Sequence, residues 1–195
     1  AEVGEEVVFD VSVTELFGWF PGGGRLAILE KGGEKDPGKI PDVIRRESVT
    51  HINFVPSMFG AFIHRLEKQN IGKLSSLEYI FLAGEALPPY QVKKFRDLNT
   101  TIVLENLYGP TEGTIYASGY SLSQWQGNGN IPIGKPLQNV KLYILDSNRC
   151  PVPIGISGEL FIAGHGVARG YLNNPGLTHA KFDHDLWDYR DYHDG

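Results

Sequence analysis

Short apolar runs alternate with helical patterns over the first 120 residues of the chain. Strands are predicted over residues 25–29, 50–55, 79–83 and 102–104. Helices are predicted over residues 37–47, from Pro56 onward with apolar residues at helical spacing, and from Pro88 onward. Continuous apolar strands joined by helices are typical of parallel strands. The sequence therefore predicts an α/β fold in which a mostly parallel sheet has flanking helices.

The pattern changes after Ser121. Residues 121–130 are polar and contain two glycines, which indicates a boundary loop. Beyond it, residues 140–145 alternate with period two, and residues 159–163 form another apolar run after a proline-rich turn. We expect an α/β part over residues 1–125, a small antiparallel β part of barrel-like form over residues 126–182, and a poorly ordered tail over residues 183–195.

Composition and charge exclude several classes of protein. The 195 residues carry a net charge of −5 without a strongly basic cluster, so DNA or RNA binding is not expected. The longest apolar run, residues 52–63, is interrupted by polar residues and is shorter than the roughly 20 residues that span a bilayer. One cysteine, Cys150, excludes an internal disulfide and fits a reducing compartment. We expect a soluble cytoplasmic protein without a signal peptide, cut from a longer chain because it lacks an initiator methionine.

Most isolated motifs have an ordinary structural interpretation. Residues 21–24 are glycine-rich, but the lysine and hydroxyl residue of a phosphate loop do not follow them. The histidines are scattered without the spacing of a zinc site, and the sequence contains no nucleophile elbow of a serine hydrolase. These features carry no functional prediction.

Three segments combine unusual residues more densely. Residues 9–17 have the arrangement of a helix start, with Asp10 or Ser12 as the cap. Residues 105–114 are typical of a strand end followed by a Gly-Pro turn, which is where open α/β sheets bind ligands. Residues 158–172 are rich in glycine and are compatible with the turns of a small barrel.

Taken in this order, the three segments resemble motifs of the amino-acid adenylation domains of non-ribosomal peptide synthetases. The motifs are F-D-x-S, N-x-Y-G-P-T-E and G-E-L-x-I-x-G-x-G-V-A-R-G-Y-L-N-x-P-x-L-T, and they match residues 9–12, 106–112 and 158–178. Residues 133–136, Ile-Gly-Lys-Pro, also match. The chain is similar to this family, within the adenylate-forming superfamily, from about residue 7 to residue 182.

The resemblance implies a reaction of secondary metabolism, including antibiotic biosynthesis. Such domains are ligases that join an amino acid to ATP, which gives aminoacyl-AMP and pyrophosphate, and then pass the acyl group to a carrier-protein phosphopantetheine thiol. ATP and Mg²⁺ are the implied cofactors. The implied partners are an amino acid and the carrier-protein and condensation domains of the same synthetase, with no nucleic acid and no membrane.

The resemblance also implies a nucleotide site. Tyr108 would stack on adenine, Asn106 would bind its edge, and the backbone of residues 84–86 would border it. Thr111 would contact the α-phosphate, and Glu112 would hold Mg²⁺, a hard cation that suits a carboxylate. The implied ATP-binding residues are Gly84, Glu85, Ala86, Asn106, Tyr108, Gly109 and Thr111.

Alignment on the same motifs implies a substrate pocket. Its residues would be Asp10, Val11, Thr14, Asn53, Phe81, Ala83, Leu107, Ile115 and Tyr116. Asp10 would pair with the α-ammonium group in a charge-assisted contact. Phe81 and Tyr116 take up volume while Thr14 and Asn53 add polarity, so we expect a substrate with a small or short polar side chain. Every position is also compatible with core packing, which is the better interpretation of Val11, Phe81 and Ile115 taken singly.

The sequence also departs from the family pattern. The triphosphate loop, the ribose-binding Y-[RK]-T-G-D-L motif and the C-terminal subdomain with its catalytic lysine do not occur in it. We therefore expect a fragment with no catalytic residue of its own that is inactive alone. Two alternatives stay open: a fragment of an acyl- or aryl-CoA ligase, against which Asp10 argues, and an inactive scaffold or interaction fragment of the same fold.

Overall fold

A computed structural model describes residues 10–30, 32–33, 36–66 and 68–182. Phe9, the first residue of the F-D-x-S match, and the tail predicted over residues 183–195 lie outside these ranges. The chain divides into two compact units. The first runs to Gly109 and includes Ser118–Lys135, and the second comprises Pro110–Ala117 and the chain from Pro136 onward.

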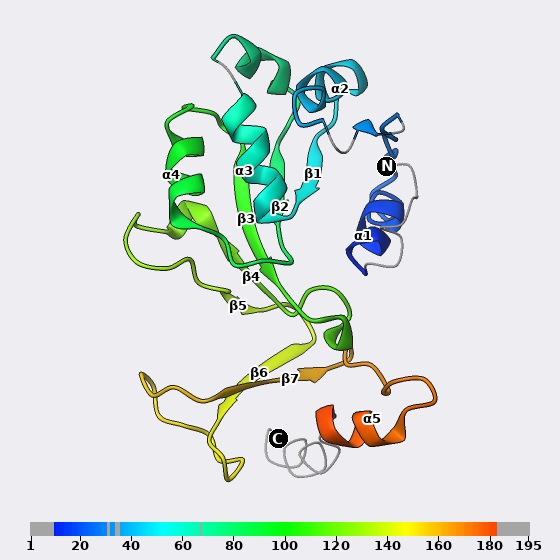
Figure 1. The fold of residues 1–195 in the computed structure, drawn as a ribbon, viewed down its shortest axis with the longest axis vertical. Coiled ribbons are helices and arrows are strands. Elements are labelled where there is room, and N and C mark those ends of the chain that lie inside the picture. The colour runs from blue at the N-terminus through cyan, green and yellow to red at the C-terminus, as the bar shows by residue number, and fades with distance from the viewer. Residues whose placement is uncertain (1–9, 31, 34–35, 67, 183–195) are drawn as a thin grey trace. The chain divides into compact units, whose positions relative to one another are not determined.

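The first unit is built on a mixed sheet. Its strands are β1 (His51–Phe54), β2 (Tyr79–Leu82), β3 (Val103–Tyr108), β4 (Ser118–Ser121) and β5 (Lys135–Pro136), in that spatial order. The first three strands pair in parallel, whereas β4 runs antiparallel to β3 (Figure 1). The predicted α/β class with a mostly parallel sheet is confirmed.

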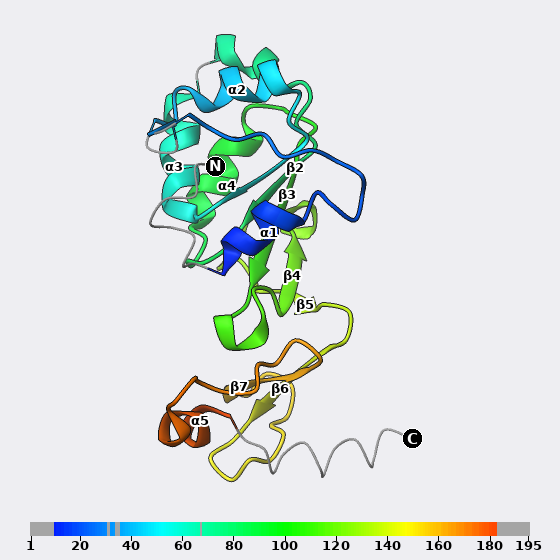
Figure 2. The same ribbon diagram turned by 90° about the vertical axis from the view of Figure 1, so that its right-hand side faces the viewer.

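Helices follow the parallel strands as predicted. They are α2 (Ile40–Glu47), α3 (Pro56–Arg65) and α4 (Pro89–Arg96), and the views in Figures 1 and 2 place α3 and α4 on the same face of the sheet. Each has a proline in its first turn, where a missing N–H breaks no helical hydrogen bond. The short helices of this unit are α1 (Val11–Phe17), η3 (Lys68–Leu74) and η5 (Leu122–Gln124).

The core of this unit lies between α3, α4 and one face of the sheet. Phe59 and Phe62 of α3 are at most 1% exposed, as are Ile80 and Leu82 of β2. The rings of Phe59 and Phe95 lie 5.5 Å apart and join the two helices. Because side chains alternate along a strand, these contacts use every second residue of each strand.

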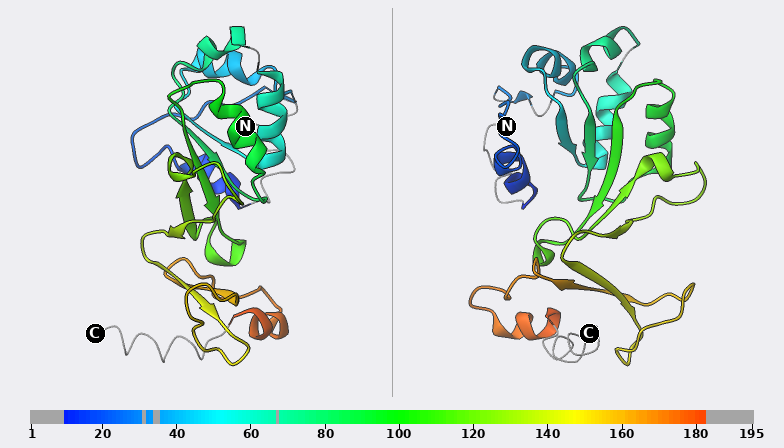
Figure 3. Two further views of the ribbon diagram at one scale, coloured as in Figure 1. Left: turned by 90° about the vertical axis from the view of Figure 1, so that its left-hand side faces the viewer. Right: turned by 180° about the vertical axis from the view of Figure 1, so that it is seen from behind.

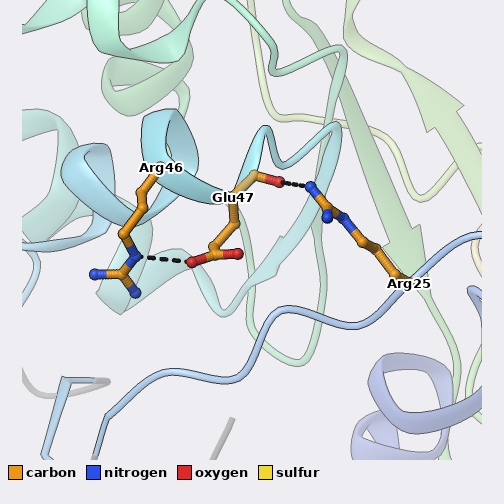
Figure 4. A network of polar contacts seen from close by, with 3 residues as sticks. All are labelled: Arg25, Arg46 and Glu47. Atoms are coloured by element: carbon orange, nitrogen blue, oxygen red, sulfur yellow. Dashed lines mark hydrogen bonds and ion pairs between the residues drawn. The ribbon is translucent and has the colours of Figure 1, made fainter.

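One predicted strand is wrong. Residues 25–29 pair with no strand in the part of the chain that the structure describes. The guanidinium of Arg25 instead donates to the backbone oxygen of Glu47, 2.8 Å away, and the Glu47 carboxylate accepts from Arg46 at 2.7 Å (Figure 4). This ion pair raises the pKa of the Arg46 guanidinium. An apolar run alone does not supply a ladder partner.

The predicted boundary loop is part of the first unit. Leu122 and Trp125 are only 2% and 4% exposed and belong to its core. The Ile-Gly-Lys-Pro motif follows, and the Ser118 hydroxyl of β4 donates to the Ile133 backbone oxygen at 2.8 Å. Gly134 has φ +88°, and a Cβ there would lie 1.9 Å from the Gly119 oxygen. Backbone contact therefore requires glycine in this motif.

The second unit contains a two-stranded antiparallel sheet, β6 (Val140–Leu145) with β7 (Glu159–Gly164), as its period-two pattern predicted (Figure 3). It also contains η4 (Thr111–Gly113) and α5 (Pro175–Lys181), a helix that was not predicted. The side chain of Asn174 caps α5 by accepting from the Leu177 amide at 3.1 Å. The described residues form no closed barrel, so the barrel-like form is not found.

Candidate functional site

Four predicted pocket residues lie on one face of the sheet. Asn53 of β1 and Phe81 of β2 are paired in register. Leu107 lies on the same face of β3, since Phe81 pairs with Glu105 two residues earlier. Ala83 follows β2 two residues beyond Phe81, and it is 7% exposed. This face is opposite to the one that packs against α3 and α4, so it is the side available for a ligand.

An amide oxygen on this face has no protein partner. Asn53 Oδ1 is buried, and the described residues place no hydrogen-bond donor within reach of it. Buried polar atoms are nearly always hydrogen-bonded in native proteins. The oxygen therefore fits a role toward a bound molecule, as predicted for Asn53.

Aromatic rings extend the same face toward the start of the strands. His51 stacks on Tyr79 with ring centroids 5.0 Å apart, and Tyr79 stacks on Phe81 at 6.0 Å. Phe81 thus forms part of a continuous aromatic row rather than of the buried core. Sequence reasoning did not assign His51 or Tyr79 to the site, although their period-two spacing from Asn53 and Phe81 indicates it.

The helix α1 carries three further pocket candidates. Asp10, Val11 and Thr14 are three or four residues apart, so they share one side of this helix, and all three are half-buried. Asp10 occupies the N-cap position, but its side chain makes no capping hydrogen bond with the described residues. The carboxylate of Asp10 is therefore not engaged as a cap.

The loop predicted to border adenine is exposed and anchored. Residues 84–86 are exposed, and Gly84 has φ +87°. The Glu85 carboxylate accepts from the backbone amide of Ser57 at 2.9 Å and from its hydroxyl at 3.0 Å. Ser57 lies in the first turn of α3, so a carboxylate there is also favoured by the helix dipole. Two hydrogen bonds thus fix the loop against α3.

The predicted adenine-contacting residues lie at the end of β3. Tyr108 is half-buried at its last position, whereas Asn106 is 6% exposed. The Asn106 side-chain amide donates to the Pro132 backbone oxygen at 2.8 Å. Asn106 therefore has a structural contact within the first unit, and its role toward adenine stays a prediction.

The remaining predicted residues lie in the second unit, in and after η4. Thr111 is exposed, Glu112, Ile115 and Tyr116 are half-buried, and the positions at 114 and 115 have φ of +60° and +69°. Consecutive β-branched residues in the left-handed region are uncommon and persist only where their surroundings hold them. Such strain is frequent at functional sites.

A second segment holds this strained turn. The Ala168 amide donates to the Glu112 backbone oxygen at 2.8 Å, and the Thr114 hydroxyl donates to the Gly166 backbone oxygen. A Cβ on Gly166 would lie 3.0 Å from the Gly113 oxygen, so the two backbones are in close contact. We refer to residues 166–171 as the strap.

The strap ends at a contact with the predicted metal ligand. The Tyr171 hydroxyl donates to Glu112 Oε1. This hydrogen bond, followed by that from the Glu112 amide, lowers the pKa of the Glu112 carboxyl, whereas the same contact raises the pKa of Tyr171. Both residues line a cavity of about 1000 Å³ together with Lys181 of α5. Glu112 is therefore ionised at neutral pH and faces open space.

These residues fit a magnesium ion that is bound together with phosphate. Mg²⁺ is usually held by one or two carboxylates and completes its shell with phosphate oxygens and water. Glu112 supplies one ionised carboxylate, and the described residues contain no group of three or more acidic, histidine or cysteine side chains that could hold a metal. The donor set suits a shared site and not an all-protein cage.

Comparison with known proteins decides the family. A family model described as "AMP-binding enzyme" matches residues 6–172. The chain belongs to this family. The AMP-binding chain is 48% identical over 174 residues to a linear gramicidin synthase of Brevibacillus parabrevis. It is 50% identical over 181 residues to polyketide synthase PksN of Bacillus subtilis and 40% identical over 192 residues to zwittermicin A synthase ZmaJ of Bacillus cereus.

These matches cover most of the AMP-binding chain but little of each relative. They cover 89%, 90% and 96% of the chain and 3%, 3% and 37% of the relatives, respectively. A solved non-ribosomal peptide synthetase, FmoA3, superposes with a TM-score of 0.77 at 27% identity over 90% of the chain and 19% of that protein. The predicted resemblance to non-ribosomal peptide synthetases is confirmed.

Sequence reasoning missed two contacts of the AMP-binding chain. Tyr171 lies inside the third matched motif, yet its pairing with Glu112 joins positions 59 residues apart. Ser57 and Glu85 are 28 residues apart, and only the proline that opens α3 marks the position of Ser57. Among the described residues, no helix is long and apolar enough to cross a membrane.

Proposed function

We propose that this chain is the part of an adenylation domain that selects an amino acid and holds part of the nucleotide. The observation that carries the proposal is the common sheet face of Asn53, Phe81, Ala83 and Leu107. Three strands far apart in sequence bring these residues together, next to the carboxyl ends where α/β sheets bind ligands. Core packing does not account for this face, because α3 and α4 cover the other one.

The proposed reaction requires positioning rather than a nucleophile from the protein. A substrate carboxylate oxygen attacks the α-phosphorus of ATP, and pyrophosphate leaves. Mg²⁺, when bound, neutralises phosphate charge as the leaving group departs. Glu112 presents an ionised carboxylate toward that cation, and Thr111 offers an exposed hydroxyl to the α-phosphate. Tyr108, Gly109 and the loop at residues 84–86 hold the adenine.

The proposed substrate is an amino acid with a small or short polar side chain. The carboxylate of Asp10 pairs with its α-ammonium group, while Phe81 and Tyr116 restrict the length of its side chain. One methylene in a pocket changes binding by only about 1–3 kcal/mol, so amino acids of neighbouring size are also accepted. The product passes to the phosphopantetheine thiol of a carrier domain, with which a condensation domain cooperates in the same synthetase.

Amino-acid-dependent exchange of pyrophosphate into ATP tests this function. A domain that contains this chain together with a triphosphate loop and a lysine subdomain is assayed against the common amino acids and a set of aryl and fatty acids. We expect exchange with small or short polar amino acids, and none with residues 1–195 alone. Exchange driven by the acids without an amino group would favour an acyl- or aryl-CoA ligase. No exchange with any acid would favour a scaffold.

A further inference from the structure

The strap gives Glu112 a partner that the proposed reaction does not yet use. Three contacts join the strap to the turn at residues 111–114, and each binds a different group of that turn. The Ala168 amide binds the Glu112 backbone oxygen at 2.8 Å, Gly166 accepts from the Thr114 hydroxyl, and the Tyr171 hydroxyl binds Glu112 Oε1. The backbone and the side chain of Glu112 are thus held separately.

We propose that Tyr171 is a positioning residue that orients the Glu112 carboxylate for a divalent cation bound with nucleotide. The inference rests on the proposed function and adds a residue to it. A glutamate side chain has three rotatable bonds, and a hydrogen bond to one carboxylate oxygen fixes the plane of the group. The occupied oxygen is Oε1, so Oε2 is left to bind the cation.

The surroundings of Tyr171 support this role. Its ring packs edge-on against Phe182 with centroids 5.5 Å apart, and its backbone amide donates to the Thr178 hydroxyl at 2.9 Å. Gly170 before it has φ +136°, and a Cβ there would lie 2.4 Å from the Thr178 side chain. Tyr171 is therefore itself fixed by α5 and the residue that follows, as a group that orients a metal ligand must be.

The test compares nucleotide binding with and without metal in a complete adenylation domain that contains this chain. Calorimetry measures the affinity for ATP in Mg²⁺ and in EDTA, and exchange kinetics measure the Mg²⁺ concentration that gives half-maximal rate. Tyr171→Phe keeps the ring and removes the hydroxyl. We expect it to raise the half-maximal Mg²⁺ concentration roughly 10-fold or more, the usual effect of removing a partner of a metal ligand. ATP affinity in EDTA and the KM for the amino acid should be unchanged.

Two further variants make the result specific. Tyr90→Phe removes the same hydroxyl from an exposed position on α4 and should change neither measurement. In a Glu112→Gln background, Tyr171→Phe should have no further effect on Mg²⁺ dependence, because the hydroxyl acts through the carboxylate. An unchanged Mg²⁺ requirement in Tyr171→Phe, or an equal loss of ATP affinity in EDTA, overturns the inference. If the unsubstituted domain binds ATP without regard to Mg²⁺, the proposed function itself fails.

Discussion

Replacing Asp10 by alanine and by asparagine separates a structural role from a substrate-binding role. Asp10 is the N-cap residue of α1, and a cap of this type usually contributes about 0.5–2 kcal/mol. Its carboxylate, however, makes no capping hydrogen bond with the described residues. We therefore expect either substitution to reduce the free energy of unfolding by less than about 0.5 kcal/mol, below the range for a working cap.

The expected loss of substrate affinity is much larger. Removing one partner of a desolvated charge pair costs roughly 2–5 kcal/mol, since the other charge stays buried and unpaired. At about 1.4 kcal/mol for each factor of ten, this is a loss of roughly 30-fold to several-thousand-fold in affinity for the amino acid. Asparagine should lose as much as alanine because it also lacks the charge.

Amino-acid-dependent pyrophosphate exchange and thermal unfolding, measured on a complete adenylation domain, check both expectations. Asparagine is the informative control, because it caps helices as well as aspartate does. If Asp10→Asn keeps full activity while Asp10→Ala loses stability and activity together, Asp10 is a cap and the proposed contact with the α-ammonium group is wrong.

Three other substitutions or conditions give measurable results. Phe59→Ala should lower the free energy of unfolding in urea by about 3–5 kcal/mol, because this fully buried ring contacts two other aromatic rings. Glu85→Ala should raise the KM for ATP roughly 2- to 10-fold with the KM for the amino acid unchanged, since it removes two hydrogen bonds to Ser57; an unchanged KM for ATP would contradict the anchoring role. The folded pKa of Glu112 lies below its usual 4.5, so its contact with Tyr171 stabilises the protein above that pH and is lost as pH falls through the folded value. The difference in melting temperature between the unsubstituted domain and Tyr171→Phe should therefore be present at neutral pH and vanish in acid.

The periodic elements of the fold could be predicted from the sequence. Residues 140–145 alternate in sequence and form β6 with the same bounds. Prolines 56 and 89 stand in the first turns of α3 and α4, near where the sequence placed the helix starts. Periodicity and proline act locally, so they are visible in a single chain.

Pairing is not local, and the failures of prediction follow from this. Residues 25–29 are apolar enough for a strand but find no partner strand in the described part of the chain. Conversely, β4 contains two serines and a glycine and was not predicted, yet its register with β3 makes it part of the sheet. A barrel was expected from glycine-rich turns, but those turns instead bring the strap against η4.

The candidate site shows the same limit. The motifs identify Asn53, Phe81 and Leu107 as a set, and the strand register explains why they share a face. No motif marks the contact of Tyr171 with Glu112, because it depends on the path of the chain between them. Sequence therefore predicts the chemical groups of the site better than the contacts that hold them.

The alternation of side chains along the parallel strands has a consequence for how such a protein can change its substrate. Neighbouring strands lie about 4.8 Å apart, so each strand contributes its side chains to the predicted pocket at a fixed place. Substitutions at Asn53, Phe81 or Leu107 alter this wall, while Phe54, Leu82 and Leu104 keep the helices attached from the other side. Selectivity can thus vary one position at a time without eroding foldability, and a designer can exchange the wall residues as a set while leaving the framework sequence untouched.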